Sequence, residues 1–226
     1  MVSSGIEKTR IENRLPVARE GIPFILIGLV ISILLISLGP LPLGVFFCIL
    51  TLFTIYFFRD PERTNNAVPD AVLSPADGWI IGIRRLDDGD NPLGEPAIKV
   101  SIFMTVFNVH VNRIPISGRI SKIAYHPGRF FSANLDKASE ENEKNRITLE
   151  TDKGGKVVFV QIAGLIARRI VCWIEEQDRV RAGQRFGLIR FGSRLDVYLP
   201  AGSRIVVLPQ SRVKAGESVL GYMTDG

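Results

Sequence analysis

Residues 21–58 read GIPFILIGLVISILLISLGPLPLGVFFCILTLFTIYFF and contain no charged residue. This stretch is much longer than the roughly 20 apolar residues that a single helix needs to cross a bilayer. At its centre, residues 38–44 (LGPLPLG) bring prolines and glycines together, and such a sequence ends a helix. The stretch therefore predicts two short apolar helices joined by a tight turn.

Basic residues lie on both sides of this hairpin. They are Lys8, Arg10, Arg14 and Arg19 before it, and Arg59 and Arg63 after it. Because the cytoplasmic flanks of membrane helices carry an excess of Lys and Arg, we expect both ends of the hairpin to lie on the cytoplasmic side. The chain then divides into a cytoplasmic segment (1–20), a membrane hairpin (21–58) and a domain on the cytoplasmic face of the cell membrane (59–226).

The length of the two helices leaves an alternative to a transmembrane hairpin. Each arm is slightly shorter than a full span, so a re-entrant or shallow hairpin also fits the sequence. A signal peptide fits less well, because no small-residue cleavage site follows a single short apolar core.

The rest of the chain alternates short apolar runs with Gly, Pro, Asp and Asn, which is typical of strands. The clearest runs are 71–73, 79–83, 98–103 and 157–160. Residues 136–146 instead have the Ala, Glu and Lys content of a helix or an ordered loop, and we expect little β structure there.

A short internal repeat also points to a β fold. Residues 180–183 (VRAG) and 213–216 (VKAG) each lead into a second glycine, Gly187 and Gly221. Such turns join strands in compact barrel-like modules, including lipoyl and biotinyl carriers. We therefore expect a mainly β (α+β) domain, barrel-like or a sandwich, after the helical hairpin; the repeat itself says nothing about function.

Cysteines and histidines are few. Cys48 lies inside the apolar stretch and Cys172 far from it, so we expect no disulfide, which fits a reducing compartment. Two separated histidines, with Cys48 in an apolar helix, make no plausible ligand set, and no metal site is predicted.

The net charge of +5 is concentrated in one region of the domain. The arginines there are Arg168, Arg169, Arg179, Arg181, Arg185, Arg190 and Arg194. On a membrane-anchored domain, an anionic lipid surface or a phosphate-bearing substrate explains such a cluster better than nucleic acid does. A solvated charged face is the remaining alternative.

Residues 190–200 (RFGSRLDVYLP) hold the most informative serine. Leu195, Val197 and Leu199 alternate with polar or amphipathic residues, so a half-buried strand begins just after Ser193, and residues 186–190 form the strand before it. Gly192 and Ser193 then lie at a turn, where the serine hydroxyl can attack the preceding carbonyl because glycine offers no side chain to block it. An ordinary turn is the alternative, since both residue types are common in turns.

Chemically, that attack would turn the amide into an ester. If a base then removes the α-proton of the serine, the ester carboxylate leaves by elimination, and the dehydroalanine that remains hydrolyses to a pyruvoyl group at a new N-terminus. Such a carbonyl can bind a substrate amine and accept the electrons left when CO2 departs.

Two further residues are candidates for this chemistry. His110, in residues 107–115 (FNVHVNRIP), can act as a base or acid near neutral pH, although a structural histidine is the alternative. His126 precedes a Pro-Gly turn, and we expect it to be structural. Asp77, in residues 74–79 (SPADGW), can orient a histidine as the acid of a triad does, or belong to an ordinary Asp-Gly turn.

Four motifs occur in the order seen in phosphatidylserine decarboxylases, and the chain resembles that family over residues 59–226. They are PADG (75–78), the His110 segment ending in RIP (113–115), GRFFSAN (128–134) and FGSR (191–194). The resemblance is closest to the short proenzyme form of many bacteria and archaea. It implies self-cleavage between Gly192 and Ser193, which leaves a β chain (1–192) and an α chain (193–226) that begins with a covalent pyruvoyl group made from Ser193.

The same resemblance implies roles for individual residues: Ser193 as nucleophile and pyruvoyl precursor, Asp77 as orienting acid, and His110 as the histidine of the chemistry. Many longer members have a second histidine, used in self-processing, where this chain has Arg113, and arginine is a poor base. Either His110 serves both maturation and decarboxylation, or cleavage depends more on backbone strain and Asp77.

The implied reaction converts the serine head group of phosphatidylserine to phosphatidylethanolamine, or acts on the archaeal ether-lipid equivalent. The substrate is a membrane phospholipid that need not leave the bilayer, and His110 would return a proton after CO2 is lost. Arg113, Arg190 and Arg194 are candidates for holding the substrate phosphate. The sequence is compatible with a homo-oligomer and does not decide the oligomeric state.

Two functions of other classes fit parts of the sequence. A non-catalytic, membrane-anchored lipoyl-like module would explain the repeated turns, but it lacks a modifiable lysine in the expected turn. A serine hydrolase could use Ser193, His110 and Asp77, but Phe-Gly-Ser-Arg is not the Gly-x-Ser-x-Gly elbow of the common hydrolase fold.

Overall fold

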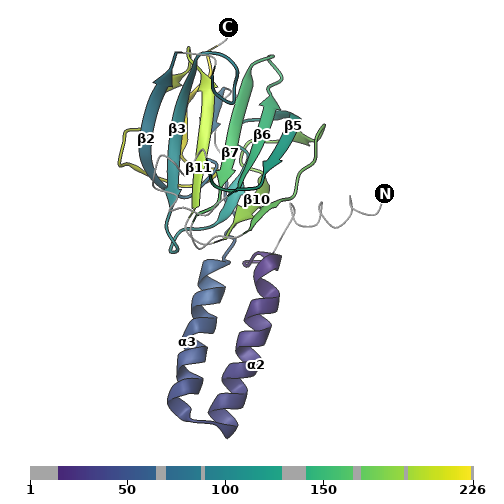
Figure 1. Ribbon diagram of the computed structural model, residues 1–226, viewed down its shortest axis with the longest axis vertical. Helices are drawn as coiled ribbons and strands as arrows, with labels where there is room; N and C mark the ends of the chain where they lie inside the picture. The colour runs from purple at the N-terminus through teal and green to yellow at the C-terminus, as the bar shows by residue number, and fades with distance from the viewer. Residues whose placement is uncertain are drawn as a thin grey trace. The chain divides into compact units, whose positions relative to one another are not determined.

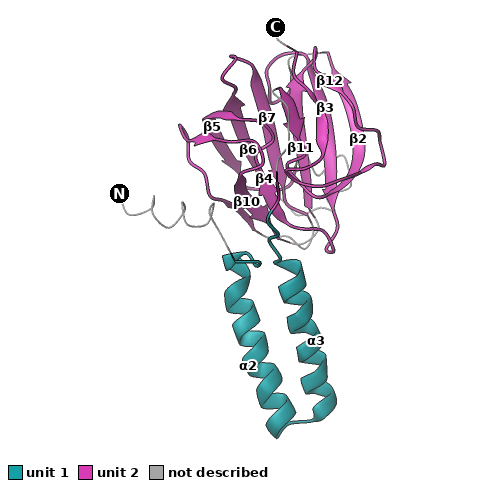
Figure 2. Cartoon of the chain, turned by 180° about the vertical axis from the view of Figure 1, so that it is seen from behind, with its two compact units in different colours: residues 1–62 teal, residues 63–226 magenta. Residues whose placement is uncertain are grey.

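The computed structural model describes residues 15–64, 70–87, 90–128, 141–164, 169–190 and 193–224. The chain separates into two compact units, Met1–Glu62 and Arg63–Gly226, shown in different colours in Figure 2. The first contains the helices and the second contains the strands.

The first unit is a helical hairpin, as predicted. After a short 3-10 turn, η1 (Arg19–Gly21), the chain forms α2 (Ile22–Leu38) and α3 (Leu41–Phe57), and these two helices lie side by side in Figure 1. Pro40 caps the start of α3, so the chain turns at the Gly-Pro pair expected from the sequence. The two ends of the hairpin are tied together by backbone bonds such as Ala18 N–H to the Phe58 carbonyl, 2.7 Å.

The helices of this unit have the composition that lipid requires. Two hydroxyl side chains that are buried in this unit bond within their own helix, Ser32 to the Gly28 carbonyl (2.7 Å) and Thr51 to the Phe47 carbonyl (2.8 Å). By length and composition, Arg19–Leu38 is able to cross a membrane, while Leu41–Phe57 is shorter.

The second unit is built of antiparallel strands. They are β1 (Ala71–Leu73), β2 (Gly78–Leu86), β3 (Ala97–Met104), β4 (Val111–Arg113), β5 (Gly118–His126), β6 (Lys144–Glu150), β7 (Lys156–Ile162), β8 (Ile170–Cys172), β9 (Arg179–Val180), β10 (Arg185–Ile189), β11 (Ser193–Pro200), β12 (Arg204–Ile205), β13 (Arg212–Val213) and β14 (Val219–Tyr222).

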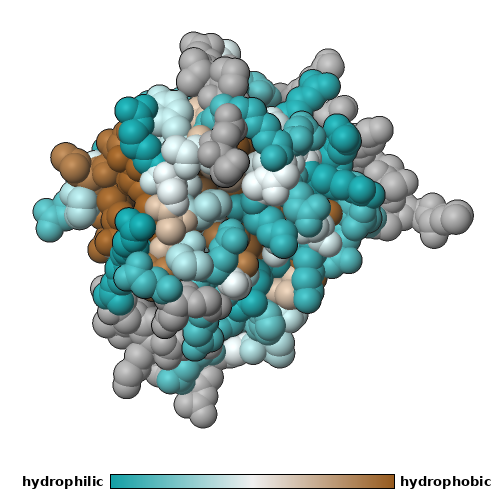
Figure 3. All heavy atoms as spheres, turned by 90° about the horizontal axis from the view of Figure 1, so that it is seen from above, coloured by the Kyte–Doolittle hydropathy of each residue, from teal (hydrophilic) through white to brown (hydrophobic). Residues whose placement is uncertain are grey.

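Most of these strands form one large, curled sheet, a half-barrel. Its order is β13-β2-β3-β11-β7-β6-β5-β9, and two three-stranded sheets, β1-β14-β12 and β4-β10-β8, complete the unit (Figure 1). The mainly β prediction is therefore confirmed. Seen from above in Figure 3, the surface that faces the viewer is mainly hydrophilic.

Part of the core lies between the curled sheet and the small sheets, where Leu195 and Val197 of β11 lie opposite Ile102 and Phe159 on neighbouring strands. The prediction of a half-buried strand is wrong, because β11 is buried at every position from Ser193 to Leu199. Its other face is covered too, since Tyr198 packs with Val158, Val160 and Ile162 in a second buried cluster. The ring of Phe159 meets that of Phe186 on β10 edge to face, with centroids 5.0 Å apart, which joins the large sheet to a small one.

The strands predicted on both sides of Ser193 are confirmed as β10 and β11. The expectation for residues 136–146 is wrong for residues 144–146, because β6 begins at Lys144; residues 136–140 lie outside the described residues. Asn145, Ile147 and Leu149 are buried on alternate positions of β6, and this burial overrides the helix preference of the charged residues between them. Cys48 and Cys172 form no disulfide in the described part of the chain.

The two Val-x-Ala-Gly turns lie against each other. Gly183 (φ 79°) and Gly216 (φ 73°) both adopt the left-handed conformation that glycine tolerates. A Cβ on Gly216 would come within 3.4 Å of the Gly183 backbone and 2.7 Å of Arg113 Cδ. The repeat is therefore structural, and it brings Ala215, the residue before Gly216, next to the candidate site.

Candidate active site

Ser193 is the first residue of β11 and pairs with Met104 at the end of β3. It is fully buried, and its hydroxyl has no hydrogen-bond partner among the described residues. Leaving a buried hydroxyl unpaired costs about 1–3 kcal/mol, and a role in the chemistry is one reason for a protein to keep such a group. Gly192 lies outside the described residues, and with it the peptide bond predicted to be cut.

His110 lies directly before β4 and is 2% exposed. Its Nδ1 is 2.9 Å from the backbone carbonyl oxygen of Asn108. A carbonyl oxygen can only accept, so Nδ1 carries the proton and Nε2 of the neutral ring carries a lone pair. The histidine is thus held in the tautomer that a general base needs.

A tight turn fixes the carbonyl that orients His110. The side-chain oxygen of Asn108 accepts bonds from both the backbone N–H and the hydroxyl of Thr105, each 2.8 Å long. The backbone N–H of Asn108 donates in turn to the Thr105 carbonyl at 3.1 Å. The connection between β3 and β4 therefore holds the imidazole through its own backbone.

Strand pairing brings His110 and Ser193 to the same end of the unit. The His110 carbonyl accepts a bond from the backbone of Ile189, the last residue of β10, and the chain reaches Ser193 four residues later. On the other side, Asn112 Nδ2 lies 3.8 Å from the sulfur of Met104, the strand neighbour of Ser193.

A row of buried amides supports this region. Gln161 Nε2 donates to Asn112 Oδ1 (2.9 Å), and Asn145 Nδ2 donates to Gln161 Oε1 (3.1 Å). All three amides are at most 3% exposed, so their hydrogen bonds are made in a dry, low-dielectric environment. The row fixes Asn112 and, through it, the position of Met104 beside Ser193.

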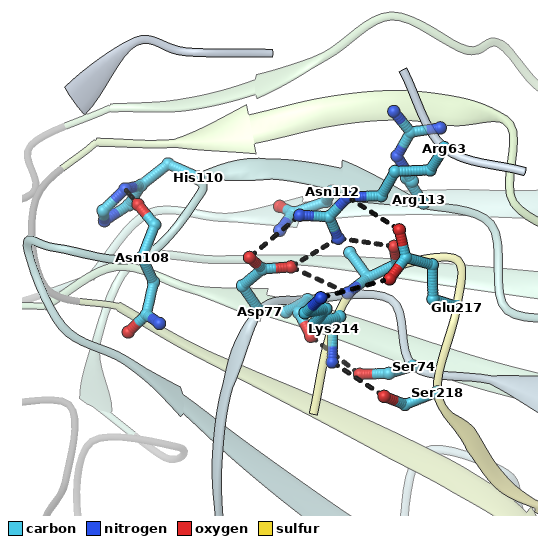
Figure 4. A network of polar contacts seen from close by, with 12 residues as sticks. Arg63, Ser74, Asp77, Asn108, His110, Asn112, Arg113, Lys214, Glu217 and Ser218 are labelled. Carbon is cyan, nitrogen blue, oxygen red and sulfur yellow. Dashed lines mark hydrogen bonds and ion pairs between the residues drawn. The ribbon is translucent and has the colours of Figure 1, made fainter. Parts of the chain in front are cut away.

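Asp77 lies in the connection between β1 and β2, as predicted, but its carboxylate is bound to Arg63 (Figure 4). Oδ1 accepts from Arg63 Nη1 (2.6 Å) and from the Ala215 backbone (2.8 Å), and Oδ2 accepts from Arg63 Nη2 (2.9 Å). Within the described residues Asp77 makes no hydrogen bond to His110. The expectation that Asp77 orients His110 directly therefore does not match these hydrogen bonds, in which the Asn108 carbonyl takes that place.

Arg113 does not take the place of a second histidine. Its Nη1 donates to the Gly183 carbonyl at 2.9 Å, and its side chain packs against Gly216. In Figure 4, Arg113 and His110 lie on opposite sides of Asp77. The structure therefore uses Arg113 to join β4 to the glycine turns.

Arg194 points to the opposite face of β11 from Ser193, because side chains alternate along a strand. Its Nε donates to Asp196 Oδ1 (2.6 Å) and its Nη2 to the hydroxyl of Ser101 (2.9 Å), and it is 2% exposed. A buried arginine already paired with a carboxylate is poorly suited to a substrate phosphate. The predicted role of Arg194 is thus not supported, whereas Arg190 is half-buried and directly follows β10.

The sequence does not indicate a role at this site for Asn108 or Arg63. Asn108 occurs only within the segment around His110, and Arg63 is recognisable only as a basic residue after the hairpin. The bond from Asn108 uses a backbone atom, which has no signature in the sequence. Arg63 is 14 residues from Asp77 and 152 from Ala215 along the chain, so no local pattern joins them.

A buried serine, a histidine of defined tautomer and a carboxylate clamped by an arginine fit an enzyme better than a carrier module. Comparison with known proteins agrees. A family model described as phosphatidylserine decarboxylase matches residues 50–221. The chain therefore belongs to the phosphatidylserine decarboxylase family, and it is a carboxy-lyase.

Curated relatives cover nearly the whole chain, and each is called a phosphatidylserine decarboxylase proenzyme. The protein of Syntrophus aciditrophicus (strain SB) is 53% identical over 206 residues, which is 91% of this chain and 96% of the relative. That of Desulfotalea psychrophila is 50% identical over 213 residues (94% and 99%), and that of Geotalea uraniireducens is 47% identical over 208 residues (92% and 97%).

Proposed function

We propose that this chain cuts itself between Gly192 and Ser193 and then decarboxylates the serine head group of phosphatidylserine to give phosphatidylethanolamine. The observation that carries the proposal is the buried hydroxyl of Ser193, which has no partner among the described residues and lies at the start of β11. Relatives called proenzymes, at about half identity, agree with a chain that matures by cleavage.

The cleavage can be written with residues of the chain. The Ser193 hydroxyl adds to the Gly192 carbonyl carbon, the C–N bond breaks, and the hydroxyl proton ends on the new amine. Removal of the Ser193 α-proton then breaks the Cβ–Oγ bond, the Gly192 carboxylate leaves, and water replaces the nitrogen, which departs as ammonia. His110 is the base we assign to the proton transfers, because its Nε2 carries the lone pair.

The curated relatives are called proenzymes, which implies self-processing, and Ser193 fits as the precursor of a pyruvoyl group. The hydroxyl is already unpaired, so its loss breaks no hydrogen bond among the described residues. When formed, the pyruvoyl carbonyl supplies an electron sink for loss of CO2 from the bound serine head group. Around it, the buried Met104 and His110 exclude water, and His110 is placed to deliver a proton after CO2 leaves.

The lipid substrate gives the hairpin a role. The apolar helices α2 and α3 would hold the enzyme at the bilayer, with the flanking basic residues on the cytoplasmic side, so that the lipid is reached without leaving the membrane. For the substrate phosphate we keep Arg190 as the candidate, because it is half-buried and directly follows β10, three residues before Ser193.

Intact-mass measurement of freshly purified protein tests the proposal. We expect two fragments that end and begin at residues 192 and 193, with the smaller one blocked at its N-terminus, and release of CO2 from lipid labelled in the serine carboxyl. Ser193→Ala should stay a single chain and release no CO2. A native wild-type preparation that remains one chain of 25.0 kDa would overturn the proposal.

Ser203 offers a matched control. It follows the other end of β11, is 7% exposed and also has a hydroxyl without a partner in the described part of the chain. Ser203→Ala should cleave and release CO2 as the wild type does, which separates the position of Ser193 from the mere loss of a buried hydroxyl.

A further inference from the structure

The Asp77 carboxylate is held in a closed ring of hydrogen bonds (Figure 4). Arg63 binds it with both terminal nitrogens, at 2.6 and 2.9 Å, and Nη1 also donates to the Ala215 carbonyl at 2.6 Å. The Ala215 N–H closes the ring by donating to Asp77 Oδ1 at 2.8 Å. Two parallel N–H···O bonds fix both the distance and the plane of a carboxylate, which a single point charge does not do.

This ring lies out of the solvent. The side chains of Arg63 and Asp77 are 7% and 12% exposed. A second carboxylate, Glu217 Oε1, lies 3.8 Å from Arg63 Nε, and its side chain is 38% exposed and also paired with Lys214. Without Arg63, the Asp77 carboxylate would keep, among the described residues, only the hydrogen bond from the Ala215 N–H, which leaves a buried charge without its counter-ion.

The position of the ring connects it to the candidate catalytic residues. The backbone N–H of Arg113 in β4 donates to the Pro75 carbonyl at 2.9 Å, so the turn that carries Asp77 is attached to the strand that follows His110. Arg63 fixes the other side of that turn. The side chain of Asp77 is therefore held between β4 and the glycine turn of Ala215.

We infer that Arg63 is a positioning residue for self-cleavage. It acts only by holding Asp77 in place beside β4, the strand that follows His110. The inference rests on the proposed function. Arg63 is also the first residue of the second unit. The residue that binds Asp77 therefore lies in the same unit as Asp77, a few residues after the end of the hairpin.

The test measures the rate of self-cleavage of the full chain made by cell-free synthesis in the presence of lipid vesicles, by a pulse-chase followed on gels. Arg63→Ala should slow cleavage by at least about tenfold, as expected for loss of one partner of a buried ion pair. The cleavage rate of Arg63→Lys should lie between that of the wild type and that of Arg63→Ala, because lysine keeps the positive charge but lacks the two parallel N–H donors of the guanidinium group. Arg204→Ala, which changes an exposed arginine stacked on Tyr222, should cleave like the wild type.

A double-mutant cycle distinguishes positioning from general stability. If Arg63 acts through Asp77, Arg63→Ala should slow cleavage no further once Asp77→Asn is present, whereas a separate structural role would add to the effect. Guanidinium ion at low millimolar concentration, well below denaturing levels, should restore part of the rate of Arg63→Ala and none of that of Asp77→Asn.

The outcomes separate this inference from the proposed function. If the wild type is not cleaved at all, the proposed function fails. If the wild type is cleaved and Arg63→Ala is cleaved equally fast, only the role of Arg63 is refuted, and additive effects in the cycle refute it too. Should Arg63→Ala not fold, Arg63→Lys decides, because a wild-type rate contradicts the inference and a rate below that of the wild type in a folded chain supports it.

Discussion

At the scale of single residues, the tautomer of His110 leads to the most direct prediction. With Nδ1 donating to the Asn108 carbonyl, Nε2 is the basic nitrogen that the structure assigns to the site. General-base catalysis contributes typically 10²–10⁴-fold, so His110→Ala should slow self-cleavage by at least about 100-fold. The rate is measured by the same pulse-chase.

The same variant resolves which step needs the histidine. A His110→Ala chain that is cleaved at the wild-type rate but releases no CO2 would assign His110 to decarboxylation alone. Cleavage would then depend on backbone strain and on the Arg63–Asp77 ring. This is the alternative stated in the sequence analysis, where Arg113 occupies the position of the second histidine of longer family members.

His126 leads to a prediction about acid stability. Burial, followed by the nearby charges of Arg146, Lys144 and Lys122, lowers the pKa of His126 below its ordinary value of 6.5. The folded protein therefore keeps the neutral ring where the unfolded chain has already taken up a proton. The stabilising contribution is present above pH 6.5 and is lost as the pH falls toward and through the lowered pKa.

His126→Gln removes this titration. Its melting temperature in detergent should fall less than that of the wild type between pH 7.5 and pH 5, as followed by differential scanning fluorimetry. Equal losses of melting temperature in the two proteins would show that His126 does not contribute to the acid sensitivity.

At the scale of elements, the turn that contains Gly216 helps to position Asp77, because the preceding residue, Ala215, binds it. The importance of Gly216 can be tested by comparing its substitution with that of Gly154. Gly154 also has a positive φ (85°), but a Cβ there would meet nothing within 4 Å, whereas one on Gly216 would meet Arg113. Gly154→Ala should cost about 1–2 kcal/mol of unfolding free energy through backbone strain alone. Gly216→Ala should cost more and should slow self-cleavage, because the neighbouring Ala215 N–H binds Asp77.

The measurements are chemical unfolding and the pulse-chase on both variants. Equal stability losses, or a Gly216→Ala chain that is cleaved at the wild-type rate, would contradict the role given to this turn.

Elements with a regular pattern of apolar residues could be predicted from sequence. The apolar stretch and its Gly-Pro break gave α2 and α3, and the alternation of Leu195, Val197 and Leu199 gave β11. The start of β6 was missed because Lys144 and Arg146 favour helices locally, while the pairing of β6 with β5 and β7, which decides the structure, is not visible within the segment.

At the scale of the whole molecule, the site depends on contacts between distant parts of the chain. Ser193, His110 and Asp77 could be chosen from motifs. The residues that hold them in place, Met104 by strand pairing and Asn108 and Arg63 by hydrogen bonds, could not. Arg63 reaches Ala215 across 152 residues, and Ser193 pairs with Met104 through the order of strands in the sheet. Sequence patterns identify reactive residue types, whereas orientation comes from backbone atoms and long-range pairing that only the folded chain defines.

The hairpin leads to a prediction about the membrane. Its outer side chains are apolar and exposed, with Ile33, Leu38 and Ile49 at 61%, 84% and 62%. Soluble proteins rarely expose so large an apolar surface, so we expect lipid to cover it. The chain should resist extraction by alkaline carbonate from bacterial membranes, and a C-terminal tag should be protected from protease in intact spheroplasts and digested after lysis.

A charged residue at the centre of a helix raises the free energy of inserting that helix into a membrane by about 2.5–3.5 kcal/mol. Ile33→Lys combined with Ile49→Lys should therefore release the chain into the carbonate wash. Leu15→Lys, which changes an exposed apolar residue outside the helices, should leave the chain in the membrane. Digestion of the tag in intact spheroplasts would place the second unit on the opposite side of the membrane. Release of the unmutated chain by carbonate would instead mean that the two helices lie shallowly on the bilayer surface, since a spanning hairpin is not removed by high pH.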